Sequence, residues 1–288
     1  MFQTLICSEE LNRDVLIHEK LQSWEKSGLQ LVLLPCDIEK WSRLDMSKAL
    51  WIVTKNEEWD MGKAKEIAML PYVPGLEEMS DWKLPSFPKA ENIISGFDDL
   101  DLEYLDRVFR REHNLPWIIA EEEDYILREF VMSDLDGLFA LYEDETLYPF
   151  VEHLFDRKQE EEYEQQYIHN MYRLLGYGMW LVCDKKSGRI IGRAGLENRD
   201  YGDSTGLEMG YLIHRDYRGK GLGSRVCKRI LEYAQKELSF REVNCLIHEE
   251  NIASIAFAQK LGFHFSEKIL DHGIEMLRYK MDFRPRKV

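Results

Sequence analysis

The chain has 288 residues, of which 44% are hydrophobic and 32% charged, and its formal net charge is −15 at pH 7. That length and composition are those of a globular chain of about two domains. The negative charge opposes binding to DNA or RNA, so we expect no nucleic-acid partner and favour cationic or neutral ligands.

The cysteine, histidine and hydropathy patterns argue against a disulfide-bonded, metal-binding or membrane-spanning protein. The five cysteines are scattered singly without a CxxC pair, and the eight histidines are dispersed, so we expect reduced thiols and no metal. No apolar run approaches the roughly 18 residues that cross a bilayer, and no basic segment precedes the first apolar residues. We therefore expect a cytoplasmic protein without a membrane partner.

Residues 1–116 form the first expected domain. Short apolar runs alternate there with helix-like stretches, a pattern typical of a small open α/β layer. Residues 69–90 contain four of the eight prolines and are predicted to be mainly irregular loop, because proline is excluded from helix interiors and central strands. We find no catalytic motif in this domain.

Residues 125–288 form the second expected domain. The pattern predicts a strand and helix from Tyr125, an acidic helix around residues 152–175, and strands in residues 179–197 and 205–214. A helix in residues 224–238, a strand, a helix beginning at Asn251 and a final strand follow. The predicted second domain is therefore a mixed sheet flanked by about four helices.

The stretch Arg218-Gly219-Lys220-Gly221-Leu222-Gly223-Ser224 stands between a strand and a helix. Its spacing fits neither a P-loop, which needs Lys directly before Ser or Thr, nor the GxGxxG dinucleotide fingerprint. Six cations and one acid lie between Arg215 and Arg229. Backbone N–H groups at a helix start, with glycines that let a ligand approach, predict a pyrophosphate site. The alternative is a glycine-rich turn beside a solvated basic helix.

These residues resemble a known family. Arg218 to Gly223 match the Arg/Gln-x-x-Gly-x-Gly/Ala signature of the GCN5-related N-acetyltransferases (GNAT), and NIASIAFAQKLGF (residues 251–263) resembles that family's following helix. The resemblance spans about residues 125–283. It implies acetyl-CoA as co-substrate, with its pyrophosphate on the N–H groups of residues 219–224, its pantetheine along the backbone of Leu212 and Ile213, and Asn251 in reach of the cofactor.

The family resemblance also implies a base. Glu208 lies on the strand ten residues before Arg218 and resembles the strand glutamate that many family members use to deprotonate the acceptor amine. Such a base is needed because an alkylammonium is mostly charged at neutral pH. The alternative is an ordinary outward-facing strand residue.

The leaving-group acid departs from the family pattern. Many relatives have a tyrosine four residues before the glycine of the Gly-Phe pair, where this chain has Ala258. Solvent, Tyr211 or His248 would then protonate the thiolate, and we assign no acid.

The sequence thus predicts transfer of an acetyl group from acetyl-CoA to a primary amine of a small molecule, a protein N-terminus or a lysine, and it allows a homodimer. The alternative is a non-catalytic acyl-CoA-binding sensor, and a third class is a scaffold whose first domain binds a partner. That first domain faintly resembles a degraded haloacid-dehalogenase-like or Rossmann-like half domain. No Asp-x-Asp pair follows its second apolar run, so we expect no phosphatase activity.

Overall fold

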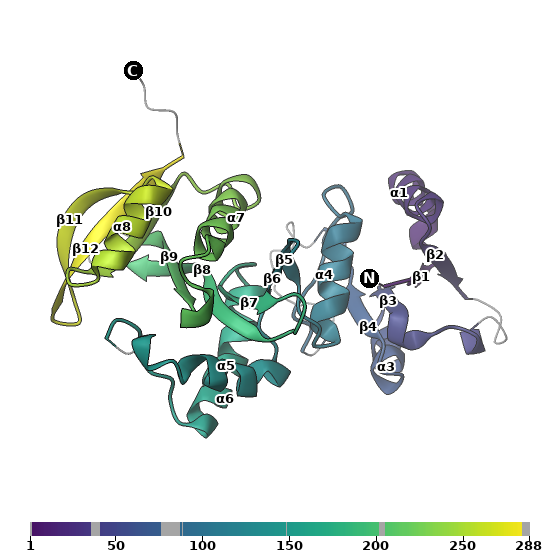
Figure 1. Ribbon diagram of the computed structural model, residues 1–288. Helices are drawn as coiled ribbons and strands as arrows, with labels where there is room; N and C mark the ends of the chain where they lie inside the picture. Colours follow the sequence, from purple (N-terminus) through teal and green to yellow (C-terminus); the bar gives the residue numbers. More distant parts are fainter. Residues whose placement is uncertain are drawn as a thin grey trace, which may run out of the picture. The chain divides into compact units, whose positions relative to one another are not determined.

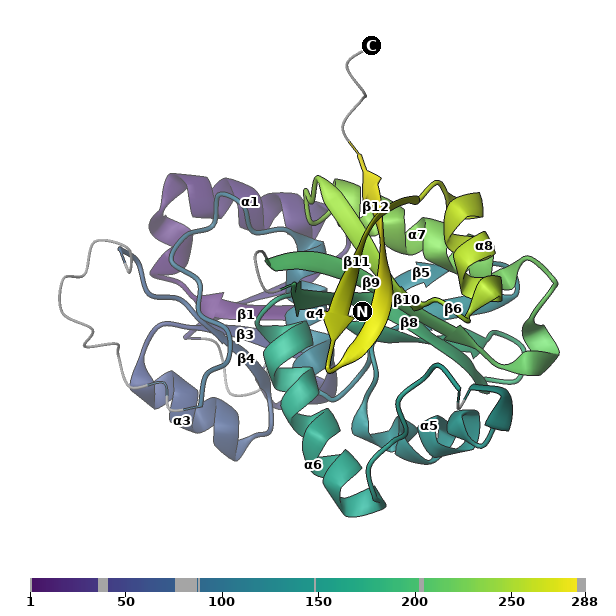
Figure 2. The same ribbon diagram turned by 90° about the vertical axis from the view of Figure 1, so that its left-hand side faces the viewer.

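The computed structural model describes residues 2–35, 41–75, 87, 89–147, 149–201 and 205–283 (Figures 1 and 2). The chain divides into two compact units, residues 1–117 and 118–288, each with its own hydrophobic core. Within the described ranges, no helix has both the length and the apolar character needed to span a membrane.

The first unit contains a parallel sheet of four strands in the order β2-β1-β3-β4. The small open α/β layer predicted from the sequence is therefore confirmed. Its strands are β1 (Thr4–Ser8), β2 (Gln30–Leu34), β3 (Ala49–Val53) and β4 (Ala68–Pro71). The α-helices that lie wholly within its described residues are α1 (Val15–Lys26), α3 (Asn56–Ala64) and α4 (Leu102–Glu112).

Helices cover both faces of this sheet. Successive side chains of a strand point to opposite faces, so Leu50 and Ile52 of β3 pack in one core with α1 and α4. Trp51 and Val53 pack in the other core, with Trp59 of α3. The unit is thus a three-layer arrangement with buried strands, as parallel sheets require.

The prediction that residues 69–90 are mainly loop is wrong at its start. Residues Met69 to Pro71 belong to β4, which pairs with β3. β4 is an edge strand and Pro71 is its last residue, a position that proline tolerates because one side of the strand needs no donor. Residues 76–86 and 88 of this stretch lie outside the described residues.

The second unit is built on an eight-stranded sheet in the order β11-β12-β10-β9-β8-β7-β6-β5. Neighbouring strands are antiparallel except β9 and β10, which are parallel and are connected through α7. The strands are β5 (Ile118–Glu121), β6 (Tyr125–Arg128), β7 (Met179–Asp184), β8 (Ile190–Asp200), β9 (Thr205–Ile213), β10 (Glu242–His248), β11 (His264–Asp271) and β12 (Ile274–Asp282).

Four α-helices lie on the two faces of this sheet in the described part of the unit: α5 (Leu135–Tyr142), α6 (Arg157–Tyr167), α7 (Leu222–Lys236) and α8 (Ile252–Leu261). In Figure 1, α7 and α8 are on one side of the strands and α5 and α6 are on the other. The predicted mixed sheet flanked by helices is confirmed. Asp156 caps α6, which continues from Ile168 to Arg173 as a π-helix.

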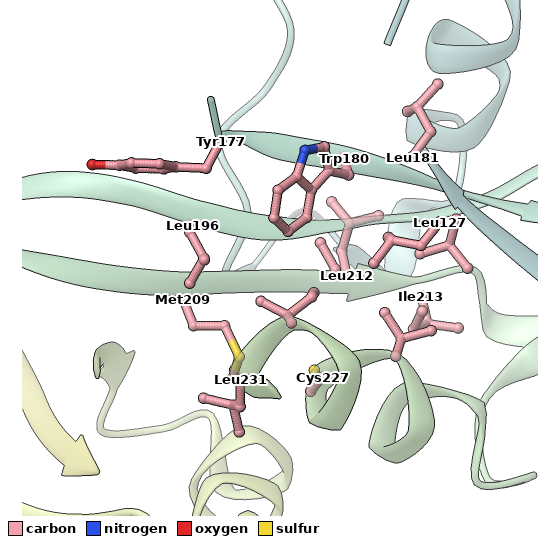
Figure 3. Close-up of a cluster of buried hydrophobic side chains, with 14 of the residues drawn as sticks. Leu127, Tyr177, Trp180, Leu181, Leu196, Met209, Leu212, Ile213, Cys227 and Leu231 are labelled. Carbon is pink, nitrogen blue, oxygen red and sulfur yellow. The ribbon is translucent and has the colours of Figure 1, made fainter. Parts of the chain in front are cut away.

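The core of the second unit fixes α7 against the centre of the sheet. Cys227 and Leu231 of α7 are buried and lie toward Met209 and Ile213 of β9 (Figure 3). The helical spacing of apolar residues in this segment predicts that contact. The packing holds the start of α7 next to the end of β9, where the glycine-rich stretch connects them.

Candidate functional site

Strands β9 and β10 diverge at the middle of the second sheet. Although they are parallel neighbours, Glu208 and Asn244 are the one pair of described residues in register between them. β8 and β9, by contrast, stay paired as far as Gly192 opposite Ile213. We call the diverging part, β9 after Glu208 and β10 after Asn244, the strand fork. Beyond Met209, whose N–H is hydrogen-bonded to Cys245 of β10, the backbone groups of β9 that face β10 in the strand fork have no strand pairing and are left for another partner.

The glycine-rich loop follows β9 and begins α7. Gly219 and Gly221 have φ angles of +73° and +80°, a left-handed conformation that residues with a side chain disfavour. A Cβ atom added to either glycine would meet no other atom within 4 Å. The loop therefore offers open space directly against its backbone.

Backbone donors are available at this loop. The N–H groups of residues 219–224 make no hydrogen bond within the described residues, and those in the first turn of a helix have no partner inside it. α7 has 15 residues, so the partial positive charge of its N-terminus adds to these donors. Together they form an arrangement that suits a pyrophosphate.

Arg218 does not offer its side chain to this space. Its Nε donates to the carbonyl of Ile213 at 2.6 Å, and its guanidinium also contacts Thr146 Oγ1 at 2.9 Å and Asp144 Oδ2 at 3.2 Å. The carboxylate of Asp144 is fully buried and also accepts the N–H of Arg215 at 2.9 Å. Arg218 therefore ties the start of the loop to β9 and to the segment after α5.

Fewer of the cations between residues 215 and 229 are free to bind an anion than their number in the sequence suggests. Arg225 forms a bidentate pair with Asp124, and Arg229 pairs with Glu122. Lys220 Nζ donates to a backbone carbonyl at 2.8 Å. Acids far away in the sequence neutralise part of the charge, so the backbone amides carry more of any anion binding than the side chains.

The backbone of β9 alternates between its two neighbours. The N–H of His214 donates to Ile191 of β8 at 2.8 Å, and groups two residues apart in a strand point the same way. Leu212 therefore directs its backbone to β8, whereas Tyr211 and Ile213 direct theirs into the strand fork. Of the two residues predicted to pair with pantetheine, Ile213 is the better placed, and its carbonyl already accepts from an arginine.

Asn251 is the N-cap of α8, as its position in the sequence predicts. Its Oδ1 accepts the N–H of Ser254 at 3.1 Å. The amide nitrogen of the same side chain makes no hydrogen bond in the described part of the chain. A contact from Asn251 to a cofactor is therefore compatible with the cap.

Glu208 lies at the point where the strand fork opens. Its side chain is 20% exposed, and its Oε2 has no hydrogen-bond partner among the described residues. Burial raises the pKa of Glu208 to about 7, against the attraction of Arg199, whose Nε is 3.7 Å from Oε2. A carboxyl group with a pKa near neutrality can accept a proton efficiently at the working pH of most enzymes.

Other acidic residues surround Glu208. Glu197 lies directly opposite on β8 and accepts a hydrogen bond from Tyr167 at 2.7 Å. Asp271 of β11 pairs with Arg199. The acids outnumber the arginine, so this part of the surface favours a cation.

The acidic helix α6 contributes inward-facing carboxylates too. Glu164 is fully buried and pairs with Arg193 of β8 at 2.8 Å. Glu160 is buried as well and accepts the N–H of Phe155 at 2.9 Å. The helix is thus more than a solvated acidic face, because two of its glutamates hold it to neighbouring segments.

The three residues considered for the leaving-group acid, Ala258, Tyr211 and His248, lie on α8, β9 and β10. Ala258 is fully buried and has no proton to give. Burial raises the pKa of Tyr211, whose hydroxyl lies 3.5 Å from the carbonyl of Ser254. His248 accepts the N–H of Glu250 at 3.2 Å. Within the described residues no group of His, Cys, Asp and Glu has the arrangement of a metal site.

The second unit resembles proteins of one known family. The family model of the acetyltransferase (GNAT) domain matches residues 124–264. The uncharacterized protein YkkB of Bacillus subtilis (strain 168) is 31% identical over 143 residues, which are 48% of this chain and 81% of YkkB. The uncharacterized N-acetyltransferase YnaD of the same organism is 31% identical over 78 residues, 26% of this chain and 45% of YnaD.

A solved structure shares the fold. The ribosomal-protein-S5-alanine acetyltransferase from Vibrio fischeri superposes with a TM-score of 0.51 at 16% identity, over 58% of this chain and 98% of that one. At that identity the likeness concerns the fold alone.

Sequence reasoning missed several residues of the site. Asp144 and Asp271 are distant in sequence from Glu208 and the glycine loop, whereas Glu197 and Arg199 lie on the strand just before β9 and reach Glu208 only through the β8–β9 register. Their only local signal is charge, which is common on protein surfaces. Strand register and the return of α5 to the loop bring them together.

Proposed function

The chain belongs to the acetyltransferase (GNAT) family, and on that premise we propose that it transfers an acetyl group from acetyl-CoA to the primary amine of a cationic acceptor. The glycine loop would hold the pyrophosphate on the N–H groups of residues 219–224. Ile213 and Tyr211 would face the pantetheine in the strand fork, and Asn251 would approach it from α8. Acetyl-CoA supplies an acetyl group activated as a thioester.

The open loop supports this cofactor. Gly219 and Gly221 leave free the volume that a Cβ atom would fill, and the amides beside them lack partners within the described residues. A dianionic group would satisfy those donors and interact favourably with the N-terminus of α7. The chemistry of the donors therefore fits a pyrophosphate.

Glu208 is the base in this proposal. An alkylammonium has a pKa near 10 and must lose a proton before its nitrogen can attack a carbonyl. Burial raises the pKa of Glu208 to about 7, so a substantial fraction of the Glu208 side chains is ionised at neutral pH. The ionised carboxylate can take that proton directly or through a water molecule. The N–H groups of Tyr211 and Ile213, directed into the strand fork, would stabilise negative charge on the carbonyl oxygen.

The acceptor is proposed to carry a second positive charge. Glu197, Glu208 and Asp271 lie together with one arginine between them, and the net charge of the chain is −15. Both the local cluster and the overall charge attract cations and repel acidic amines. A diamine or a basic peptide satisfies this requirement, whether its reacting group is a side chain or an N-terminus.

The single observation that carries the proposal is the position of Glu208 at the residue where β9 and β10 stop pairing. Release of the CoA thiol from acetyl-CoA tests it, with 1,4-diaminobutane and 1-aminobutane as a matched pair that differs by one ammonium. We expect a kcat/KM at least about tenfold higher for the diamine. Equal values would refute the acceptor charge. Tight CoA binding without thiol release from any amine, including basic peptides, would instead favour a non-catalytic sensor.

A further inference from the structure

The first unit contains a cavity at the carboxyl ends of its parallel strands. From β1 the chain passes through α1 to β2 on one side, whereas β3 lies on the other side of β1 and leads through α3 to β4. α1 and α3 pack on opposite faces of the sheet. The strand order therefore reverses between β1 and β3, the position at which open α/β sheets bind ligands.

The cavity has the size and lining of a small-molecule site. Its volume is about 550 Å³, within the range of about 300–1,000 Å³ that is usual for ligand pockets. Among the described residues, the apolar part of the lining is formed by Leu34, Pro35, Trp41, Trp51 and Met61. The rings of Trp41 and Trp51 meet edge to face at 5.6 Å. Trp41 is partly exposed and Trp51 buries its ring behind it, and an indole held in the wall in this way favours a flat, ring-bearing ligand.

The two helix starts beside these strands are already occupied. Asp14 accepts the N–H groups of Leu16 and Ile17 in the first turn of α1, at 2.9 and 3.1 Å. Glu58 accepts the N–H groups of Thr54 and Lys55 before α3, at 2.6 and 3.2 Å. A phosphate would need those donors and would be repelled by the carboxylates that hold them. The site is therefore unsuited to a nucleotide.

Charges at the cavity are of two kinds. Glu10 and Lys55 neutralise each other in an ion pair at 3.1 Å. Glu9 and Arg13 also line the cavity, are exposed, and have no side-chain partner in the described part of the chain. One unpaired carboxylate and one unpaired guanidinium, four residues apart, complement a ligand that carries both an ammonium and a carboxylate.

We propose that this cavity binds a free aromatic α-amino acid, such as phenylalanine or tryptophan. The ring would lie against Trp41, which is backed by the fully buried Trp51, the ammonium would pair with Glu9, and the carboxylate would pair with Arg13. The proposal concerns the first unit and does not depend on acetyl transfer.

Calorimetric titration of the full chain tests this site. The probes are phenylalanine, phenylalanine amide, which lacks the carboxylate, 3-phenylpropionate, which lacks the amine, and alanine, which lacks the ring. We expect phenylalanine to bind at least about tenfold more tightly than any of the other three. Equal affinity of the amide and the parent amino acid, or no heat with phenylalanine at millimolar concentration, would overturn the proposal.

Variants separate this site from any other amine site on the chain. Arg13→Gln should weaken phenylalanine about tenfold and leave phenylalanine amide unaffected, because the amide makes no pair with the guanidinium. Glu9→Gln should weaken phenylalanine similarly and leave 3-phenylpropionate unaffected. Lys26→Gln and Glu19→Gln change exposed charges of α1 outside the cavity lining and serve as matched controls. Identical affinities in all four variants would show that the amino acid binds elsewhere.

Discussion

Gly221 carries the most specific prediction of a single residue. It starts α7 with a φ of +80° and open space where a Cβ atom would be. Gly221→Val should therefore fill the volume that a pyrophosphate needs and abolish CoA binding by calorimetry. The backbone conformation is also strained for valine, at a cost of about 1–3 kcal/mol of stability.

Gly188 provides the matched control for that strain. It lies in the β7–β8 turn with a φ of +73° and nothing within 4 Å of an added Cβ atom. Gly188→Val should lower the melting temperature to a similar degree and leave CoA affinity unchanged. CoA affinity that survives Gly221→Val would remove the pyrophosphate site from the glycine loop.

Glu208 also makes a prediction about stability. Its pKa in the folded chain is raised by burial from 4.5 to about 7. The protonated form is therefore favoured by folding, and the stability it contributes is fully present below pH 4.5 and lost as the pH rises through about 7.

Glutamine at position 208 cannot ionise, so Glu208→Gln should escape this loss. We expect the free energy of unfolding of the variant, relative to the parent chain, to increase by up to roughly 3 kcal/mol between pH 4.5 and pH 8. Urea denaturation at several pH values measures it. A difference that stays constant over this range would mean that the carboxyl group titrates normally and is not desolvated.

At the scale of elements, Asp144 links the end of α5 to the glycine loop. Burial would raise the pKa of Asp144, but hydrogen bonds from Thr146 and from the N–H of Arg215, with the charge of Arg218, outweigh it and hold the pKa below its usual range. The carboxylate therefore stays ionised and holds the loop through two residues of the segment that precedes it.

Asp144→Ala should release Arg218 and disorder the loop amides, so that CoA binds about tenfold more weakly. Asp124→Ala is the matched control, because Asp124 pairs with Arg225 of α7 in an exposed bridge that contributes little. Calorimetry measures both variants. If CoA binds to Asp144→Ala with the parent affinity while its melting temperature falls, Asp144 serves folding alone.

Elements with a strong local signal could be predicted from the sequence. The spacing of Val226, Ile230 and Leu231 indicates α7, and the glycines before it indicate a close backbone approach. β11 was not predicted, because its side chains are mostly exposed and lack a buried alternation. Such an edge strand is stabilised by its pairing with β12, and no local pattern in the residues of β11 itself indicates that pairing.

At the scale of the whole molecule, the two units differ in how much function their sequence reveals. The second unit carries a contiguous motif, so its family and fold could be inferred from residues 218–223 and 251–263. The cavity of the first unit is assembled from the ends of separate strands and from helix α3. Such a site depends on topology, and no spacing along the chain identifies it.

The most direct test of the account is the pH dependence of kcat and KM for acetyl transfer to a diamine, compared between the parent chain and Glu208→Gln from pH 6 to 9. Because the base must be ionised, the parent activity should rise with pH through about 7.

The variant should lose about 10²- to 10⁴-fold in kcat at neutral pH with nearly unchanged acetyl-CoA affinity, and its defect should shrink as free amine becomes available at high pH. An increase in the acceptor KM with kcat preserved would mean that Glu208 binds the cation without acting as base. Parent values of kcat and KM across the whole pH range would contradict the account.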